Sequence, residues 1–191
     1  MTRSEAVNEL KRVFVVLQND IQAALTLGRV DASQFAHRTL IRTHFAYVEG
    51  LAYQLRQVTL ASLDGTDLLT PAEYALLREQ RFQLDAKGLP EQKDNFQKVL
   101  PNLLFAIRCY VKNHGAQFEP DTRHHGWDAM RRALEIRDRL THPKSAAGLE
   151  VSEEDAKHFL DAVEWWKMTL LQMFNACGEA DEYFRAQDGA E

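Results

Sequence analysis

Residues 126–144 read GWDAMRRALEIRDRLTHPK, a stretch with one apolar face and one charged face. At about 100° per residue, the apolar residues form a single arc of the helical wheel, and Arg137 falls near its middle. Pro143 disfavours helical geometry in the residue before it, so the pattern predicts a helix over about 125–141. The apolar arc consists of Trp127, Ala129, Met130, Ala133, Leu134, Ile136 and Leu140.

Arg137 and His142 are the candidate functional pair of this helix. A guanidinium does not lose its proton, so in an apolar setting it needs a carboxylate, a phosphate or water as a partner. His142 lies just past the predicted helix end, where its imidazole is free to turn back. Two structural alternatives remain open: Arg137 pairs with a buried carboxylate such as Glu49, and His142 caps the helix through the macrodipole.

Composition indicates one domain of 191 residues, of which 45% are hydrophobic. We predict a helical domain over 1–178 and a flexible acidic tail over 179–191. The net charge of −5 argues against indiscriminate nucleic-acid binding, but residues 131–144 hold five basic residues against two acids. The longest apolar run is too short to span a bilayer, and Cys109 and Cys177 have no metal-type spacing. These features favour a reduced, cytoplasmic protein that does not enter a membrane.

Helical periodicity extends along almost the whole chain, and no stretch sustains the alternation of a β-strand. Thr2 and Thr70 each precede a glutamate at capping-box spacing, which marks two helix starts. Pro101 is expected to kink or split the fourth helix. The fold prediction is an all-α antiparallel bundle of five to six helices. Its helices are expected over about 4–27, 32–62, 70–88, 91–114, 125–141 and 152–177.

The run IRDRLTHPK at 136–144 resembles the signature of HEPN domains (higher eukaryotes and prokaryotes nucleotide-binding). Arg137, Asp138 and His142 occupy the arginine, small polar and histidine positions of that signature. The bare spacing also occurs at two other Arg–His pairs, but only Arg137–His142 combines an apolar arc with a proline-terminated helix. The second helix, with HRTLIRTHFAYVEGLAYQLR at 37–56, is similar to the family as well, and the resemblance covers about 34–166. On that helix, Arg38, Arg42, Glu49 and Arg56 form a ridge, interpreted as a salt-bridged face or a dimer contact.

The resemblance implies a metal-independent endoribonuclease without a cofactor, whose composite active site lies at a homodimer interface. In that chemistry the 2′-hydroxyl of RNA attacks the adjacent phosphorus and leaves a 2′,3′-cyclic phosphate. His142 would transfer a proton, and Arg137 would hold the phosphate. Asp138 would orient one of these two residues, and Glu49 would bond Arg137 from the second helix. Flanking phosphates would be held by Arg131, Arg132, Arg139 and Lys144.

The expected partners are a second copy of the chain and RNA or a nucleotide, in a defence or toxin–antitoxin context. A cognate antitoxin or a nucleotidyltransferase is a further candidate partner. One toxin branch of the family has a tyrosine two residues after the histidine, as an acceptor for nucleotide modification. Here that position is Lys144, so that mode of regulation is not inferred. The alternative function is a non-catalytic HEPN-like module that binds a nucleotide, RNA or a protein.

Overall fold

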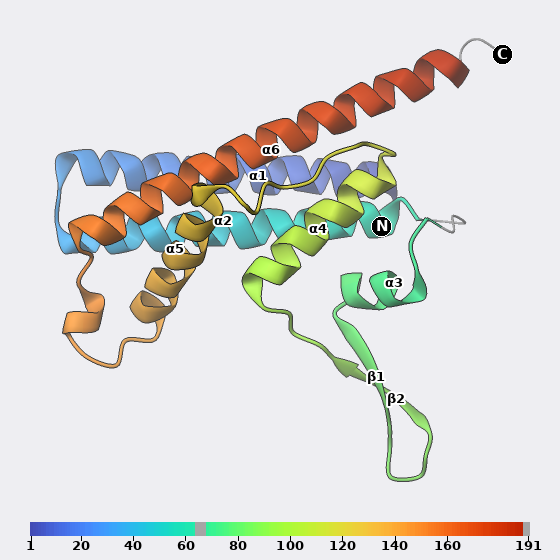
Figure 1. The fold of residues 1–191 in the computed structure, drawn as a ribbon, viewed down its shortest axis with the longest axis horizontal. Helices are drawn as coiled ribbons and strands as arrows, with labels where there is room; N and C mark the ends of the chain where they lie inside the picture. The colour runs from blue at the N-terminus through green and yellow to red at the C-terminus, as the bar shows by residue number, and fades with distance from the viewer. Residues whose placement is uncertain (64–67, 189–191) are drawn as a thin grey trace.

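The computed structural model describes residues 1–63 and 68–188, with side chains through Tyr183 (Figure 1). This part of the chain contains six α-helices and one β-hairpin, so the predicted all-α helical bundle is confirmed. The helices are α1 (Arg3–Val30), α2 (Gln34–Ala61), α3 (Pro71–Leu77), α4 (Val99–Asn113), α5 (His125–Thr141) and α6 (Glu153–Asp188). No helix within the described ranges is long and apolar enough to cross a membrane.

Helix α2 is the centre of the bundle. It runs antiparallel beside α1, and α4 and α5 also pack against it (Figure 1). Helix α6 lies along α5 and completes the core. The predicted stripe of α2 is fully buried because its apolar positions recur at helical spacing, which places them on one face. That stripe consists of Ile41, Phe45, Val48, Ala52 and Leu55.

The helix starts follow local side-chain chemistry. Thr2 and Thr70 both form capping boxes, with Glu5 and Glu73 respectively, as predicted. Pro101 lies in the first turn of α4, which begins at Val99 and not at residue 91. Backbone N–H groups of a first turn have no partner within the helix, so proline is tolerated there and the expected kink does not occur.

Residues 80–94 were predicted to be mostly helical, and this prediction is wrong. They form an antiparallel hairpin of β1 (Gln80–Leu84) and β2 (Pro90–Asp94), which projects away from the helices (Figure 1). Asp85 organises its turn by accepting hydrogen bonds from the backbone N–H groups of Lys87 and Leu89, both at 2.8 Å. Most side chains of the two strands are exposed. Phe82 and Leu84 alternate with polar residues in β1, but both are exposed, and this alternation is too short for its sequence to be recognised as a strand.

The predicted end of the last helix, near Cys177, is also wrong. Helix α6 continues through Gly178 to Asp188. A single glycine inside a helix costs only about 1 kcal/mol relative to alanine, which does not end a long helix. The expected acidic tail, 179–191, is thus helical as far as Asp188, and residues 189–191 lie outside the described residues.

Candidate functional site

Helix α5 has the predicted bounds and is seated on α6 by a close approach at its first turn. A Cβ atom added to Gly126 would lie 2.6 Å from the Cβ of Trp165 on α6. The ring Nδ1 of His124 caps this end by accepting a 3.1 Å hydrogen bond from the N–H of Gly126. Gly126 and the His124 cap together position the N-terminal end of α5 on α6.

Arg137 lies between α5 and α2 and is 17% exposed. Its Nη2 bonds a carboxylate oxygen of Glu49, the contact expected from the sequence, and its Nη1 lies 2.9 Å from Oδ1 of Asp138. The guanidinium carbon lies 5.4 Å from the ring centre of Phe45, which is a cation–π contact. Among the described residues its Nε has no hydrogen-bond partner. Each Nη nitrogen has a second N–H, so a phosphate that bonds Arg137 would lie beside Glu49 and Asp138, which are both exposed carboxylates.

His142 follows the last residue of α5 and has left helical geometry, with φ −123° and ψ 63°. Its backbone N–H donates to the carbonyl oxygen of Asp138 at 2.9 Å, and its imidazole is exposed. A hollow of about 580 Å³ opens beside it, lined by Asp138, Arg139, Lys144 and Ser145 as well. Asp138 is common to both surroundings, because it pairs with Arg137 and lines the same hollow as His142.

The α2 ridge attaches neighbouring segments to the central helix. Arg42 bonds the carbonyl oxygen of Leu140 near the end of α5, and Arg38 donates to the carbonyl of Leu149 at 3.1 Å. Together with the Glu49–Arg137 pair, these contacts hold the C-terminal turn of α5 and the loop after it. The ridge residues Arg38, Arg42 and Glu49 thus bind α5 and the loop after it within one chain.

Of the four predicted phosphate-binding residues, Arg139 and Lys144 line the hollow beside His142, whereas Arg131 and Arg132 do not. Arg139 donates to the carbonyls of Gly148 and Glu150, at 2.9 and 2.7 Å, and pairs with Asp155 at 2.8 Å. These contacts hold the loop between α5 and α6 against the end of α5. On the exposed face, Arg131 pairs with Asp128 and Arg132 with Glu135, while Lys144 is exposed in the loop.

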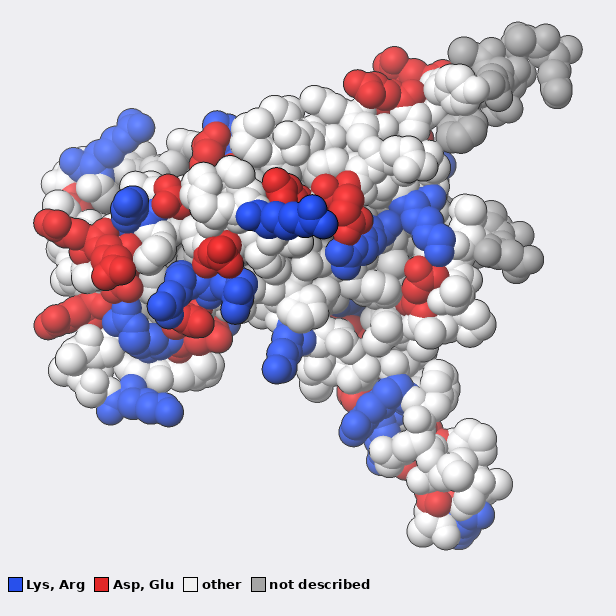
Figure 2. Space-filling model, in the orientation of Figure 1, with Lys and Arg blue, Asp and Glu red and all other residues white. Residues whose placement is uncertain are grey.

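Basic and acidic side chains also interleave on the face drawn in Figure 2, and no continuous basic surface covers it. This distribution argues against broad electrostatic attraction of nucleic acid to that face. Within the described part of the chain, no cluster of three or more metal-binding side chains is present.

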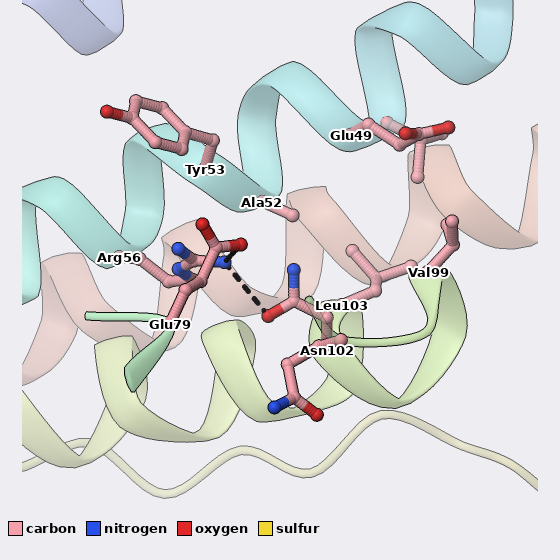
Figure 3. A pocket seen from close by; sticks show the side chains of 10 residues that line it. Glu49, Ala52, Tyr53, Arg56, Glu79, Val99, Asn102 and Leu103 are labelled. Atoms are coloured by element: carbon pink, nitrogen blue, oxygen red, sulfur yellow. Dashed lines mark hydrogen bonds and ion pairs between the residues drawn. The ribbon is translucent and has the colours of Figure 1, made fainter. Parts of the chain in front are cut away.

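A second hollow, of about 210 Å³, is lined in part by Glu49, the partner of Arg137 (Figure 3). The sequence did not predict this hollow. It lies between α2, α4 and the residue before β1, and its lining includes Arg56, which is only 2% exposed. Arg56 had been placed on the ridge, but its partner Glu79 lay within a predicted helix. The contact between Arg56 and Glu79 could not be predicted, because it depends on the hairpin that follows Glu79 and was not recognised in the sequence.

No protein-family model matches the chain, and comparisons with curated proteins and with solved structures give no match either.

Proposed function

We propose that the chain is a HEPN-type, metal-independent endoribonuclease with a composite active site at a homodimer interface. The 2′-hydroxyl oxygen bonds to the adjacent phosphorus and the bond to the 5′ oxygen breaks, which gives a 2′,3′-cyclic phosphate and a 5′-hydroxyl. His142 exchanges the protons that leave the 2′-hydroxyl and reach the 5′ oxygen. Arg137 stabilises the charge on the phosphoryl oxygens. The proposed biological context is defence or a toxin–antitoxin system.

The observation that carries the proposal is the link through Asp138. This carboxylate binds a partly buried guanidinium on one side and, on the other, lines an open hollow with an exposed imidazole. Cleavage by internal attack requires a cation to stabilise the phosphoryl charge and a group that transfers protons. Arg137, which two carboxylates position, and His142, which is exposed, can supply these two functions. A second copy of the chain would cover the hollow and bring a second pair to the same cleft.

The second candidate is a non-catalytic module that binds a nucleotide, RNA or a protein. It is favoured by a specific feature, the pairing of Arg137 with both Glu49 and Asp138 inside one chain. Two carboxylates neutralise the cation, so Arg137 then serves mainly to hold α5 on α2.

The deciding experiment is incubation of the purified protein with varied single-stranded RNAs in the presence of EDTA. Arg137→Ala and His142→Ala should each lower the cleavage rate by about a hundredfold or more, with cyclic phosphate ends on the wild-type products. Two controls replace exposed residues of the same types elsewhere, Arg108→Ala on α4 and His125→Ala at the start of α5. RNA binding without cleavage would favour the second candidate, and cleavage that survives both site substitutions would refute the proposed mechanism.

A further inference from the structure

The hollow next to Glu49 has the size and the lining of a small, polar ligand site. Its volume is about 210 Å³, and its polar lining comes from α2, from α4 with the segment before it, and from the turn before β1. Glu49 belongs both to this hollow and to the ion pair with Arg137, so the hollow adjoins the proposed cleavage site. Its polar and aromatic lining residues are Glu49, Tyr53, Arg56, Glu79, Gln97 and Asn102. Figure 3 labels all of them except Gln97.

Arg56 is a buried cation with hydrogen-bonding capacity left over. Its Nη1 donates to Oε1 of Glu79 at 2.9 Å and to Oδ1 of Asn102 at 3.1 Å. Its Nε is buried and has no partner among the described residues. Buried donors in proteins are nearly always paired, so this Nε leaves room for an acceptor from water or from a ligand.

Glu79 is held in an unusual backbone conformation that places its carboxylate beside Arg56. Its φ is 55°, the left-handed region that residues other than glycine rarely adopt. Its N–H donates to the carbonyl of Leu76 at 3.0 Å, and its own carbonyl accepts from Asn95 at 2.7 Å. The start of the hairpin therefore fixes the carboxylate side by side with the guanidinium, as Figure 3 shows.

Tyr53 supplies an aromatic wall at the same place. Tyr53 is 49% exposed, and the guanidinium carbon of Arg56 lies 5.8 Å from its ring centre. A half-exposed ring beside a charged hydrogen-bonding pair is an arrangement on which an unstacked base can lie flat.

The geometry points to a guanine-binding pocket that selects the nucleotide next to the cleaved phosphate. Guanine presents two adjacent N–H donors, N1–H and the N2 amino group, next to the O6 acceptor. Glu79 accepts from the two donors, Arg56 donates to O6, and Tyr53 stacks on the base. Adenine, cytosine and uracil do not offer two adjacent N–H donors beside an acceptor. The role in RNA cleavage depends on the function proposed above, but guanine binding itself does not.

The test is calorimetric titration of the full-length protein with guanosine 5′-monophosphate and with the adenosine, cytidine and uridine monophosphates. Ribose 5-phosphate serves as a probe for binding through the sugar and phosphate alone. Guanosine monophosphate should bind at least tenfold more tightly than each of the other probes. Glu79→Gln, which keeps an acceptor for Arg56, and Tyr53→Leu should each weaken that binding at least tenfold. Two matched controls outside the pocket, Glu91→Gln and Tyr74→Leu, should leave it unchanged.

Equal binding of the four nucleotides, equal binding of ribose 5-phosphate, or no binding of guanosine monophosphate would overturn the inference. Tyr53→Leu decides the test if thermal melting shows that Glu79→Gln is unfolded. His142→Ala should bind guanosine monophosphate as wild type does, which separates the two proposals. Guanine binding without any RNA cleavage supports the pocket and counts against the nuclease. Cleavage that depends on His142 but has no preference for guanine supports the nuclease and counts against the guanine pocket.

Discussion

Arg137 is the residue on which the proposed chemistry depends. Its charge must be compensated in the folded chain, and its guanidinium must stay accessible to a phosphate. Glu49 and Asp138 neutralise its charge, while 17% of the side chain remains exposed. Ion pairs at partly exposed positions are typically worth about 1 kcal/mol or less, so an incoming phosphate can compete with a carboxylate at moderate cost. The same contacts that hold α5 on α2 thus keep the guanidinium in place for a substrate.

The two cysteines should be chemically inert in the folded protein. Both are free and buried, and burial raises the pKa of the Cys109 thiol and of the Cys177 thiol to about 12. Because the thiolate is the reactive form, neither cysteine should react with a thiol-specific chromogenic reagent at neutral pH under native conditions. Both should react within minutes once urea unfolds the chain. Rapid reaction of either thiol in the native protein would contradict the buried positions.

His44 should make the protein less stable in mild acid. Burial lowers its pKa from the ordinary value of 6.5 to about 4, so the folded state keeps the imidazole neutral where the unfolded chain binds a proton. Stability contributed by the neutral ring is present above about pH 6.5 and is lost as the pH falls toward 4, by at most about 1.4 kcal/mol per pH unit.

Urea unfolding at about pH 7 and about pH 5 measures this loss. The variant His44→Leu, which cannot titrate, should show a smaller drop in unfolding free energy between the two pH values. An identical drop in both proteins would show that other groups cause the acid sensitivity.

At the scale of elements, the contact between α5 and α6 requires a glycine at position 126. In Gly126→Ala the new Cβ would lie 2.6 Å from Trp165, so the helices must separate locally, at a cost of about 1–3 kcal/mol. Thermal melting should show a lower midpoint. Gly178→Ala on α6 is the matched control, because nothing lies within 4 Å of its added Cβ, and it should stabilise by about 0.5–1 kcal/mol.

Arg139 should matter for stability more than its neighbours on the same helix. It bonds two loop carbonyls and Asp155, so Arg139→Ala removes three contacts that hold the loop and should cost about 1–2 kcal/mol. Arg132→Ala removes only an exposed pair with Glu135 and should change stability by less than about 0.5 kcal/mol. Equal effects in urea unfolding would show that the loop does not depend on Arg139.

At the scale of the whole molecule, the proposed composite site requires two copies of the chain. Light scattering after size exclusion should give twice the 21.9 kDa mass of one chain at concentrations where RNA is cleaved. On dilution, specific activity should fall together with the dimer fraction. A monomer that cleaves RNA with undiminished activity would place the complete site within one protomer and refute the shared cleft.

Local sequence determined much of the fold. The bounds of α5, the two capping boxes and the buried stripe of α2 all follow from interactions within a few residues along the chain. Helical periodicity and capping are expressed at that range, so they can be recognised without knowledge of the neighbours. The pairing of Arg137 with Glu49 was also accessible, because both residues lie on the facing sides of strongly patterned helices.

Tertiary structure alone decided the rest. The hairpin at 80–94 has mostly exposed side chains and only a short apolar alternation, Phe82 and Leu84, so the pairing of its strands defines it. The contacts of Arg139 and the pocket around Arg56 and Glu79 join residues from segments whose approach depends on packing and on loop paths. The sequence alone thus specified most of the helical segments and the apolar faces that they bury. Only the packed molecule decided which charged groups meet, because those distances depend on the arrangement of several elements at once.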